Sequence, residues 1–219
     1  WIQKNGVYVN FRRPIYADHE ANLKAIPRKQ RAMVRKAISF GLTSQVDDSI
    51  DRLHDIYAQS VRHLGTPVFA KRYFRLLKEQ FGADCDIVSV AHGDTTIASV
   101  MNFYFRDEVL PYYGGGTARA RALAANDFLY WEVMRRACNN GLKVFDFGRS
   151  KIGTGAYHFK KNWGFEPVPI THWFLPVNAQ EIPDVNPLNP KYATMIAVWR
   201  RLPLVLTKLI GPPIVRQIG

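Results

Sequence analysis

The sequence predicts an α+β fold in which one mixed sheet is flanked by helices. Three segments with strand periodicity follow one another in the middle of the chain, at residues 85–91, 96–106 and 108–113, and short turns join them into an antiparallel meander. Helical segments precede this meander, and helix alternates with strand after it. The 219 residues are 47% hydrophobic and 22% charged, as in a globular protein with a sizeable core. We expect one large domain with appendages.

One strand and three helices are predicted before the meander. Residues 7–13 alternate as a strand does, and a basic helix is expected from about residue 22 to 40, with Pro27 in its first turn. A second helix follows Ser49, which can cap it, and runs to residue 64. A third covers about 70–81.

The segments after the meander alternate between helix and strand. The glycines at 114–116 are expected to form the turn into a long helix at 126–140, which Gly141 ends. A short buried strand at 143–147, a short helix at 157–162 and a strand at 169–177 follow. The tail is predicted to contain two helices, at about 190–201 and 204–210, after a linker at 182–190.

The net charge of +12 is concentrated at the two ends of the chain. Residues 1–40 contain nine Lys and Arg and two acids, whereas residues 185–219 contain five Lys and Arg and no acid. Arg28, Arg31 and Arg35 fall on one face of the first predicted helix. This face is either a solvated surface or a contact for the phosphates of tRNA, nucleotide or glycolipid. DNA binding is not expected, because no helix-turn-helix or zinc-finger pattern accompanies the charge.

Cysteine, histidine and hydropathy patterns exclude several classes of protein. Cys85 and Cys138 form neither a disulfide scaffold nor a CxxC pair, and the histidines lack HExxH or other ligand spacing, so no metal site is expected. No signal peptide precedes Trp1, and no run of about 18 apolar residues occurs. We therefore expect a cytoplasmic location and no membrane span.

A groove is predicted where the meander ends. Pro111 cannot donate to a strand ladder, so we expect its strand to part from a neighbour there and to leave backbone groups free to bind a ligand. An ordinary edge-strand proline is the alternative. The run Gly114-Gly115-Gly116-Thr117 allows close approach of an anion, and Arg119 and Arg121 lie within reach of it. It is not a Walker motif, since no Gly-Lys-Ser/Thr follows.

Asp146-Phe147-Gly148 has the letters of a kinase motif, but the rest of the chain excludes a kinase. There is no His-Arg-Asp loop, no glycine-rich strand pair upstream and no Val-Ala-Ile-Lys segment. Asp146 ends a buried strand beside Arg149 and Lys151. It is expected either to bind substrate or to form a structural ion pair or turn cap.

The most specific stretch runs from residue 145 to 165. It reads Phe145-Asp146-Phe147-Gly148-Arg149-Ser150-Lys151, then Gly153-Thr154-Gly155, then Tyr157-His158-Phe159-Lys160-Lys161-Asn162-Trp163-Gly164-Phe165. It resembles the signature of FemAB-related acyltransferases of the GNAT fold, in which a strand ending in an acidic residue precedes a glycine turn and a Phe-Lys-x-x-aromatic-Gly segment. Leu-Gly-Thr-Pro at 64–67, Pro-Tyr-Tyr-Gly-Gly-Gly at 111–116 and Asn-Pro-Leu-Asn-Pro-Lys at 186–191 resemble the subgroup associated with exosortase/PEP-CTERM exopolysaccharide gene clusters, with its BioF2-like acetyltransferase domain.

The resemblance implies a GNAT-like fold and transfer of an acyl or aminoacyl group to an amine. The donor would be acyl-CoA, acyl carrier protein or aminoacyl-tRNA, with no permanently bound cofactor. The acceptor would be an amino sugar, a lipid-linked sugar or a peptide amine, handled at the cytoplasmic face of the membrane in exopolysaccharide or cell-envelope biosynthesis. The predicted catalytic residues are Lys160, Phe159, Tyr113 and Asp146; the donor residues are Gly114, Gly115, Gly116, Thr117, Arg119 and Arg121; the acceptor residues are Arg149, Lys151 and Tyr157.

Members of the resembled family usually contain two tandem modules, which implies a division of this chain. Residues 1–40 are expected to be the remnant of a preceding module, 41–181 the acyltransferase domain and 182–219 a basic helical tail. The helical-hairpin arm of the peptidoglycan-bridge enzymes is absent, which weakens an aminoacyl-tRNA assignment.

Lys160 is the residue expected to carry the chemistry. Phe159 and Trp163 fall on one face of a short helix and can anchor it, whereas Lys160 points elsewhere, on the side of Tyr157. Its ammonium could stabilise the oxyanion or a donor phosphate. A general base would require burial that lowers the lysine pKa, and a solvated lysine beside Lys161 is the structural alternative.

A noncatalytic module that binds RNA or anionic lipid through its basic ends is the alternative function. In the tail, apolar residues surround Arg200, Arg201 and Lys208 without an acid. This pattern predicts peripheral contact with anionic membrane, with docking of the same apolar residues on the fold as the alternative.

Overall fold

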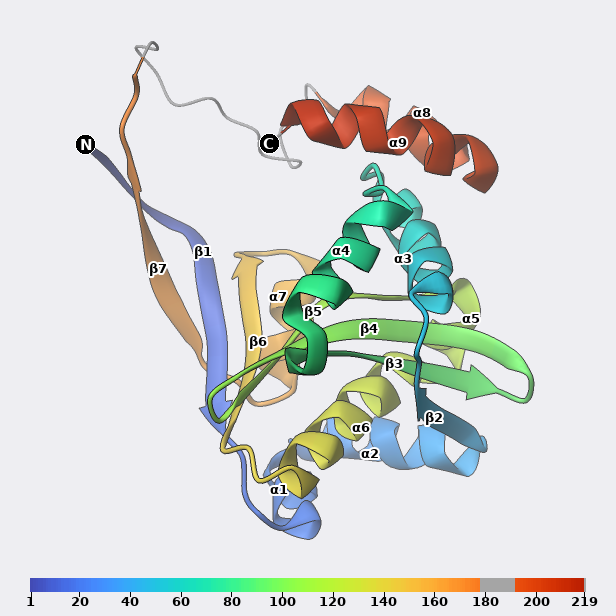
Figure 1. Cartoon of the computed structure of the whole chain (residues 1–219). Coiled ribbons are helices and arrows are strands. Elements are labelled where there is room, and N and C mark those ends of the chain that lie inside the picture. Colours follow the sequence, from blue (N-terminus) through green and yellow to red (C-terminus); the bar gives the residue numbers. More distant parts are fainter. Residues whose placement is uncertain (178–191, 219) are drawn as a thin grey trace.

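A seven-stranded mixed sheet forms the centre of the molecule in the computed structural model, which describes residues 1–177 and 192–218. Its strand order is β2-β3-β4-β5-β6-β1-β7 (Figure 1), and every neighbouring pair is antiparallel except β5 and β6. The strands are β1 (Ile2–Pro14), β2 (Leu42–Val46), β3 (Cys85–His92), β4 (Thr95–Phe105), β5 (Glu108–Gly116), β6 (Val144–Lys151) and β7 (Pro167–Phe174). The predicted α+β class and the meander of three strands are confirmed.

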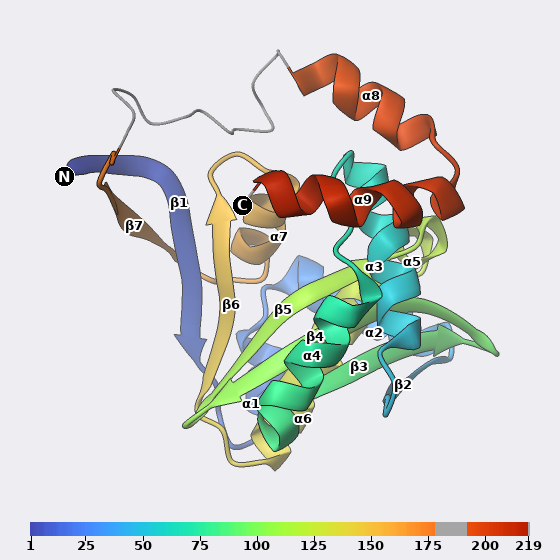
Figure 2. The same ribbon diagram turned by 45° about the horizontal axis from the view of Figure 1, so that its top comes forward.

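Helices cover both faces of the sheet. They are α1 (His19–Ala25), α2 (Arg28–Ser39), α3 (Asp51–Leu64), α4 (Lys71–Phe81), α5 (Ala118–Ala122), α6 (Ala125–Asn139), α7 (Gly155–Asn162), α8 (Ala193–Arg201) and α9 (Leu204–Ile218), with a short 3-10 turn at Gly82–Asp84. Helices α1, α2 and α6 lie on one face, and α3 and α4 lie on the other (Figure 1). Turning the molecule shows α8 and α9 beyond the end of α3, and both helices contact α3 (Figure 2).

The two largest hydrophobic clusters of the described residues, one on each face, hold these layers together. The larger cluster joins α2 and α6 to β1 and β6, with Phe11, Val34 and Phe145 fully buried. The smaller joins α3 and α4 to β3 and β4 around Leu53 and Phe74. The boundary predicted at residue 40 falls inside the larger cluster, because β1 lies between β6 and β7 and α2 packs on α6.

The basic segment predicted as one helix is two, α1 and α2. Ile26 ends α1 with an extended backbone, φ −72° and ψ 131°, and Pro27 precedes the first residue of α2. A residue before proline is disfavoured in the helical region, and proline has no N–H to continue the first helix. The predicted helix is therefore interrupted at Ile26 and Pro27.

The glycine run belongs to a strand, which corrects the turn expected there. β5 continues to Gly116, and Gly114, Gly115 and Gly116 face Val100, Ser99 and Ala98 of β4. Pairing with a neighbouring strand outweighs the weak strand propensity of glycine. The additional helix α5 then separates β5 from α6. The predicted linker at 182–190 and the motif at 186–191 lie outside the described residues.

Candidate functional site

The sheet opens between β5 and β6. The two parallel strands pair only at Glu108 with Val144 and at Val109 with Phe145. Beyond these pairs β5 follows β4, whereas β6 follows β1. The last β5–β6 pair is at Val109, two residues before Pro111. The β4–β5 register also shifts at this proline, because Asn102 faces Pro111 whereas Met101 faces Tyr113. The parting of strands expected near this proline is therefore present.

A cavity of about 570 Å³ lies at this opening. Its walls come from the end of α3, the end of β5, α5, the start of α6, and α7. The lining residues are Met33, Ser60, His63, Leu64, Gly114, Gly115, Gly116, Thr117, Ala120, Arg121, Ala124, Asn126, Asp127, Tyr130, Phe147, Gly155, Ala156, Phe159 and Lys160.

Most of the predicted donor residues line this cavity, and Arg119 does not. Arg121 is on the wall, whereas the Arg119 Nη2 lies 2.7 Å from Nδ1 of His92. The glycines are required by packing within the protein: a Cβ on Gly115 would overlap Ser60 of α3, and a Cβ on Gly116 would lie 2.8 Å from the Ala120 Cβ. Packing within the protein is thus one reason for these glycines.

Lys160 projects from α7 toward the carbonyl groups of β6. Its Nζ donates to the carbonyl oxygens of Gly148 and Arg149, each at 3.1 Å. Burial lowers the pKa of Lys160 to about 8, and the negative charge of Asp146 opposes this shift. The chain thus supplies an amine that is partly neutral at mildly basic pH, which is the condition required of a general base.

Aromatic side chains fix the position of α7. Thr154 caps the helix by accepting from the Tyr157 N–H at 3.3 Å, and Trp163 after its end is fully buried. Phe159 contacts Tyr130 and Trp163, with ring centroids 5.5 and 6.0 Å apart. The spacing of Phe159 and Trp163 does anchor the helix on one face, as predicted.

Asp127 is a cavity residue that sequence reasoning misses. It is 7% exposed, and its Oδ1 accepts from Gln30 Nε2 at 3.0 Å and from Trp163 Nε1 at 2.9 Å. Burial raises its pKa, and the two hydrogen bonds oppose the shift. In the sequence it is one acid in the first turn of a helix, and that pattern more often marks an exposed residue that complements the helix dipole.

Tyr113 lies outside the cavity. Its hydroxyl is 2.8 Å from that of Tyr73 on α4, and its ring packs against Tyr57 and Phe74 on the α3 and α4 face of the sheet. Burial raises the Tyr113 pKa, with the Tyr73 hydroxyl as the second cause. Tyr113 thus does not share the cavity with Lys160 and Phe159, the residues with which it is predicted to act.

The remaining predicted residues are on β6 and α7, outside the cavity, and they contact β1. Asp146 accepts from the backbone N–H of Gly148 at 2.7 Å and so caps the bend that follows it. The cations of Arg149 and Lys151 lie over the ring of Tyr8, at 5.2 and 5.8 Å from its centroid. Tyr157 packs edge-on against Phe11, with centroids 5.6 Å apart.

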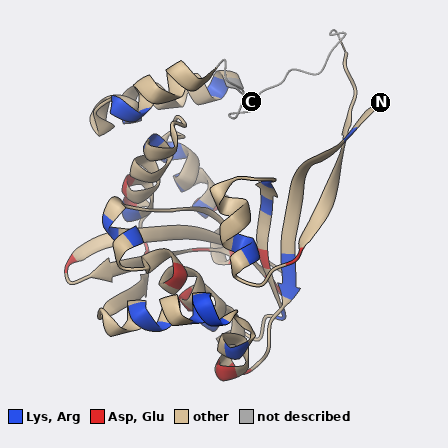
Figure 3. Ribbon diagram, turned by 180° about the vertical axis from the view of Figure 1, so that it is seen from behind, with Lys and Arg blue, Asp and Glu red and all other residues tan. Residues whose placement is uncertain are grey.

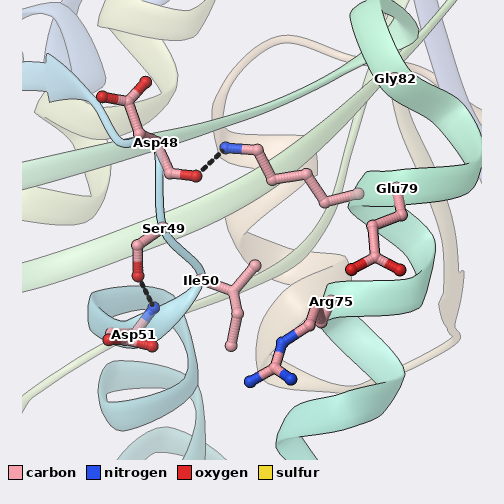
Figure 4. Close-up of a pocket in the computed structure, with 8 residues that line it drawn as sticks. Asp48, Ser49, Ile50, Asp51, Arg75, Glu79 and Gly82 are labelled. Atoms are coloured by element: carbon pink, nitrogen blue, oxygen red, sulfur yellow. Dashed lines mark hydrogen bonds between the residues drawn. The ribbon is translucent and has the colours of Figure 1, made fainter.

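A second hollow, of about 540 Å³, lies between the start of α3 and α4 (Figure 4). The Lys78 Nζ donates to the carbonyls of Asp47 and Asp48, and Lys71 pairs with Asp51 at 2.7 Å. No predicted site residue lines it. Within residues 1–177 and 192–218, no group of three or more His, Cys, Asp or Glu side chains is placed to hold a metal ion.

Known proteins share this architecture. A family model described as Acetyltransferase (GNAT) domain matches residues 22–161. The crystal structure of FemX superposes with a TM-score of 0.67 at 14% identity, over 74% of this chain and 61% of that one. The structure of L-PGS from Bacillus licheniformis gives 0.54 at 15% identity, over 96% and 67%. The C-terminal domain of a putative lysylphosphatidylglycerol synthetase from Agrobacterium fabrum gives 0.53 at 15%, over 78% and 60%.

These likenesses show the fold. The chain spans about three fifths of the length of the FemX structure. No curated protein sequence matches it.

Proposed function

Because the chain belongs to the acetyltransferase (GNAT) domain family, we propose that it transfers an acyl or aminoacyl group from an activated donor to an amine. The observation that carries this proposal is the opening between β5 and β6, with a cavity on it that Lys160 and Phe159 help to line. An opened sheet exposes unpaired backbone groups at the point where an acyl carbonyl must be held.

The donor is assigned to the cavity. Thr117 and Arg121 lie on its wall at the end of β5, where the phosphates of acyl-CoA, of a carrier-protein arm or of aminoacyl-tRNA would be bound. Its volume of about 570 Å³ is within the range of small-molecule sites. The acyl carbon would then reach the opening beside Lys160.

The acceptor amine is assigned to the polar groups that border the opening outside the cavity, namely Tyr113 on β5 and Arg149 and Lys151 on β6. In the reaction the amine nitrogen bonds to the acyl carbon, and the bond from that carbon to the donor sulfur or oxygen breaks. The proton leaves the amine, and the departing thiolate or alkoxide takes up a proton.

Lys160 is proposed as the base that takes the proton of the amine. In its neutral form the two N–H bonds serve the carbonyls of Gly148 and Arg149, which leaves the lone pair free. In its charged form the third N–H is free to stabilise the oxyanion instead. The lowered pKa favours the base.

The biological setting is proposed from the motifs shared with exosortase/PEP-CTERM clusters, namely exopolysaccharide or cell-envelope biosynthesis. One of these motifs, at 64–67, has a structural reason: a Cβ on Gly65 would overlap Ile196 of α8. The glycine permits α8 to dock on the end of α3. An amino sugar, a lipid-linked sugar or a peptide amine fits this setting as acceptor.

Donor binding followed by single-turnover transfer tests the proposal. Acetyl-CoA, a longer acyl-CoA, an acyl carrier protein and aminoacyl-tRNA are each titrated by calorimetry, and the bound donor is then mixed with amino sugars or peptides. Mass spectrometry should show a product heavier by the acyl group. Absence of both donor binding and transfer for all four donors would overturn it.

The noncatalytic RNA-binding module is the second candidate, and α2 supports it. Arg28 and Arg35 are exposed on this helix, and Figure 3 shows blue Lys and Arg segments along it. Binding of RNA that weakens steeply with salt, without acyl transfer, would favour that module.

A further inference from the structure

Helices α8 and α9 use only one side for docking on the fold. Thr207 is 1% and Trp199 is 8% exposed, and Gly211 fits against Val68. Lys208 pairs with Asp55 at 2.5 Å, and Arg62 donates to the Leu202 carbonyl at 2.8 Å. One side of α8 and α9 therefore docks on the fold. Docking of the tail is one of the two alternatives that the sequence leaves open.

The other side of α9 is a stripe of apolar side chains that ends in an arginine. Val205, Leu209, Pro212 and Arg216 recur at intervals of four, three and four residues, which places them on one helix face. Val205 is 80% and Leu209 is 72% exposed, and neither contributes to the docking contacts of the opposite face. Such exposure of large aliphatic side chains along one face is unfavourable in water and marks an interaction surface.

The stripe continues into an apolar groove of about 430 Å³ between α9 and α4. The groove is lined by Phe69, Ala70, Arg72, Tyr73, Leu76, Pro212, Val215 and Arg216. Two arginines and no acid therefore border it. Neither Arg72 nor Arg216 forms an ion pair with a carboxylate within the described parts of the chain.

We propose that the α9 stripe and the α4–α9 groove form a docking surface for a membrane that contains anionic phospholipid. The aliphatic side chains would enter the boundary between headgroups and acyl chains, and Arg72 and Arg216 would bind the phosphates. The charge favours this occupant, because residues 185–219 contain five Lys and Arg and no acid. No helix within the described residues is long and apolar enough to cross a membrane.

The surface lies on the acceptor side of the opening. Tyr73 lines the groove, and its hydroxyl is 2.8 Å from that of Tyr113 on β5. A membrane held at the groove is thus close to Tyr113, on the α4 side of the sheet. The membrane contact itself does not depend on acyl transfer.

Vesicle flotation of the full chain tests the proposal. Neutral phosphatidylcholine vesicles are compared with vesicles that also contain about one third phosphatidylglycerol, at low and at physiological salt. The protein should float with the anionic vesicles only, and less at higher salt. Val205→Asp/Leu209→Asp should abolish flotation, and Arg72→Ala/Arg216→Ala should reduce it at least severalfold.

The matched control is Arg28→Ala/Arg35→Ala, which removes two exposed arginines from α2 and should leave flotation unchanged. Thermal unfolding of each variant checks that the fold is intact, as expected for exposed positions. Equal flotation with neutral and anionic vesicles, no flotation with either, or loss in the α2 variant with retention in the α9 variant would each overturn the proposal.

Discussion

Gly115 of β5 and Ser60 of α3 are in such close contact that a Cβ on the glycine would overlap the serine side chain. The contact brings α3 directly onto the end of β5, beside the cavity. Glycine is therefore required at this position for the packing of a helix on a strand.

A change at Gly115 is expected to act on stability first. Gly115→Ala should lower the midpoint of thermal unfolding, because the new methyl group must displace Ser60. In a Ser60→Gly background, which removes the opposing Cβ and Oγ, the same change should cost much less. Equal losses in the two backgrounds would show that the contact is not the cause.

Arg121 and Arg119 form a matched pair for testing the donor site. Arg121 lines the cavity, whereas Arg119 is engaged with His92 outside it. Arg121→Ala should weaken donor binding about tenfold or more by removing a charge near the phosphates, while Arg119→Ala should not. Calorimetric titration of the two variants measures the difference. Equal weakening would place the phosphates elsewhere.

Lys160→Ala should reduce turnover about 100- to 1000-fold, the usual cost of one electrostatic or proton-transfer contact. Lys161 is the control, since it is exposed on the same helix. Lys161→Ala should retain nearly full activity. Unchanged turnover of Lys160→Ala with the true substrates would remove this residue from the mechanism.

The pH dependence separates the two roles of Lys160, whose pKa is about 8. A base must be neutral, so kcat/KM should rise roughly tenfold per pH unit below this value and level off above it. Lys160→Arg stays charged over this pH range, so the rise of kcat/KM with pH should disappear in this variant. Activity that falls as the pH passes 8 would instead assign the oxyanion role to the ammonium form.

Asp127 is expected to link stability to pH. Its pKa is raised in the folded state, so its charged form opposes folding above the unfolded value and the penalty disappears as the pH falls below that value. Asp127→Asn keeps an acceptor for Gln30 and Trp163 without the charge. Its gain in thermal stability over the wild type should be larger at pH 7 than near pH 4.

Asp127→Ala is the control, because it leaves two buried N–H donors unpaired and should destabilise the fold by about 1–3 kcal/mol for each. Denaturant unfolding at both pH values measures both variants. A gain for Asn that does not depend on pH would show that the carboxylate is not desolvated.

Local patterns in the sequence determined the class of fold and most of its elements. Short apolar segments separated by turns defined β3 and β4, Gly141 with φ of +73° ends α6 as predicted, and Phe159 and Trp163 anchor α7. Each of these depends on residues within a few positions of one another. The short strand β2 escaped this reasoning, since only Leu42 of its five residues is buried.

Tertiary structure alone decided which predicted site residues share a space. Lys160 and Gly115 line the same cavity, whereas Tyr113 lies outside it with Tyr73 and Asp146 caps a bend of β6. Asp127 also lines the cavity. Its hydrogen-bond partners, Gln30 of α2 and Trp163 after α7, are far from it along the chain. Sequence periodicity encodes the direction of a side chain relative to its own element, but burial and pKa depend on the elements that pack against it.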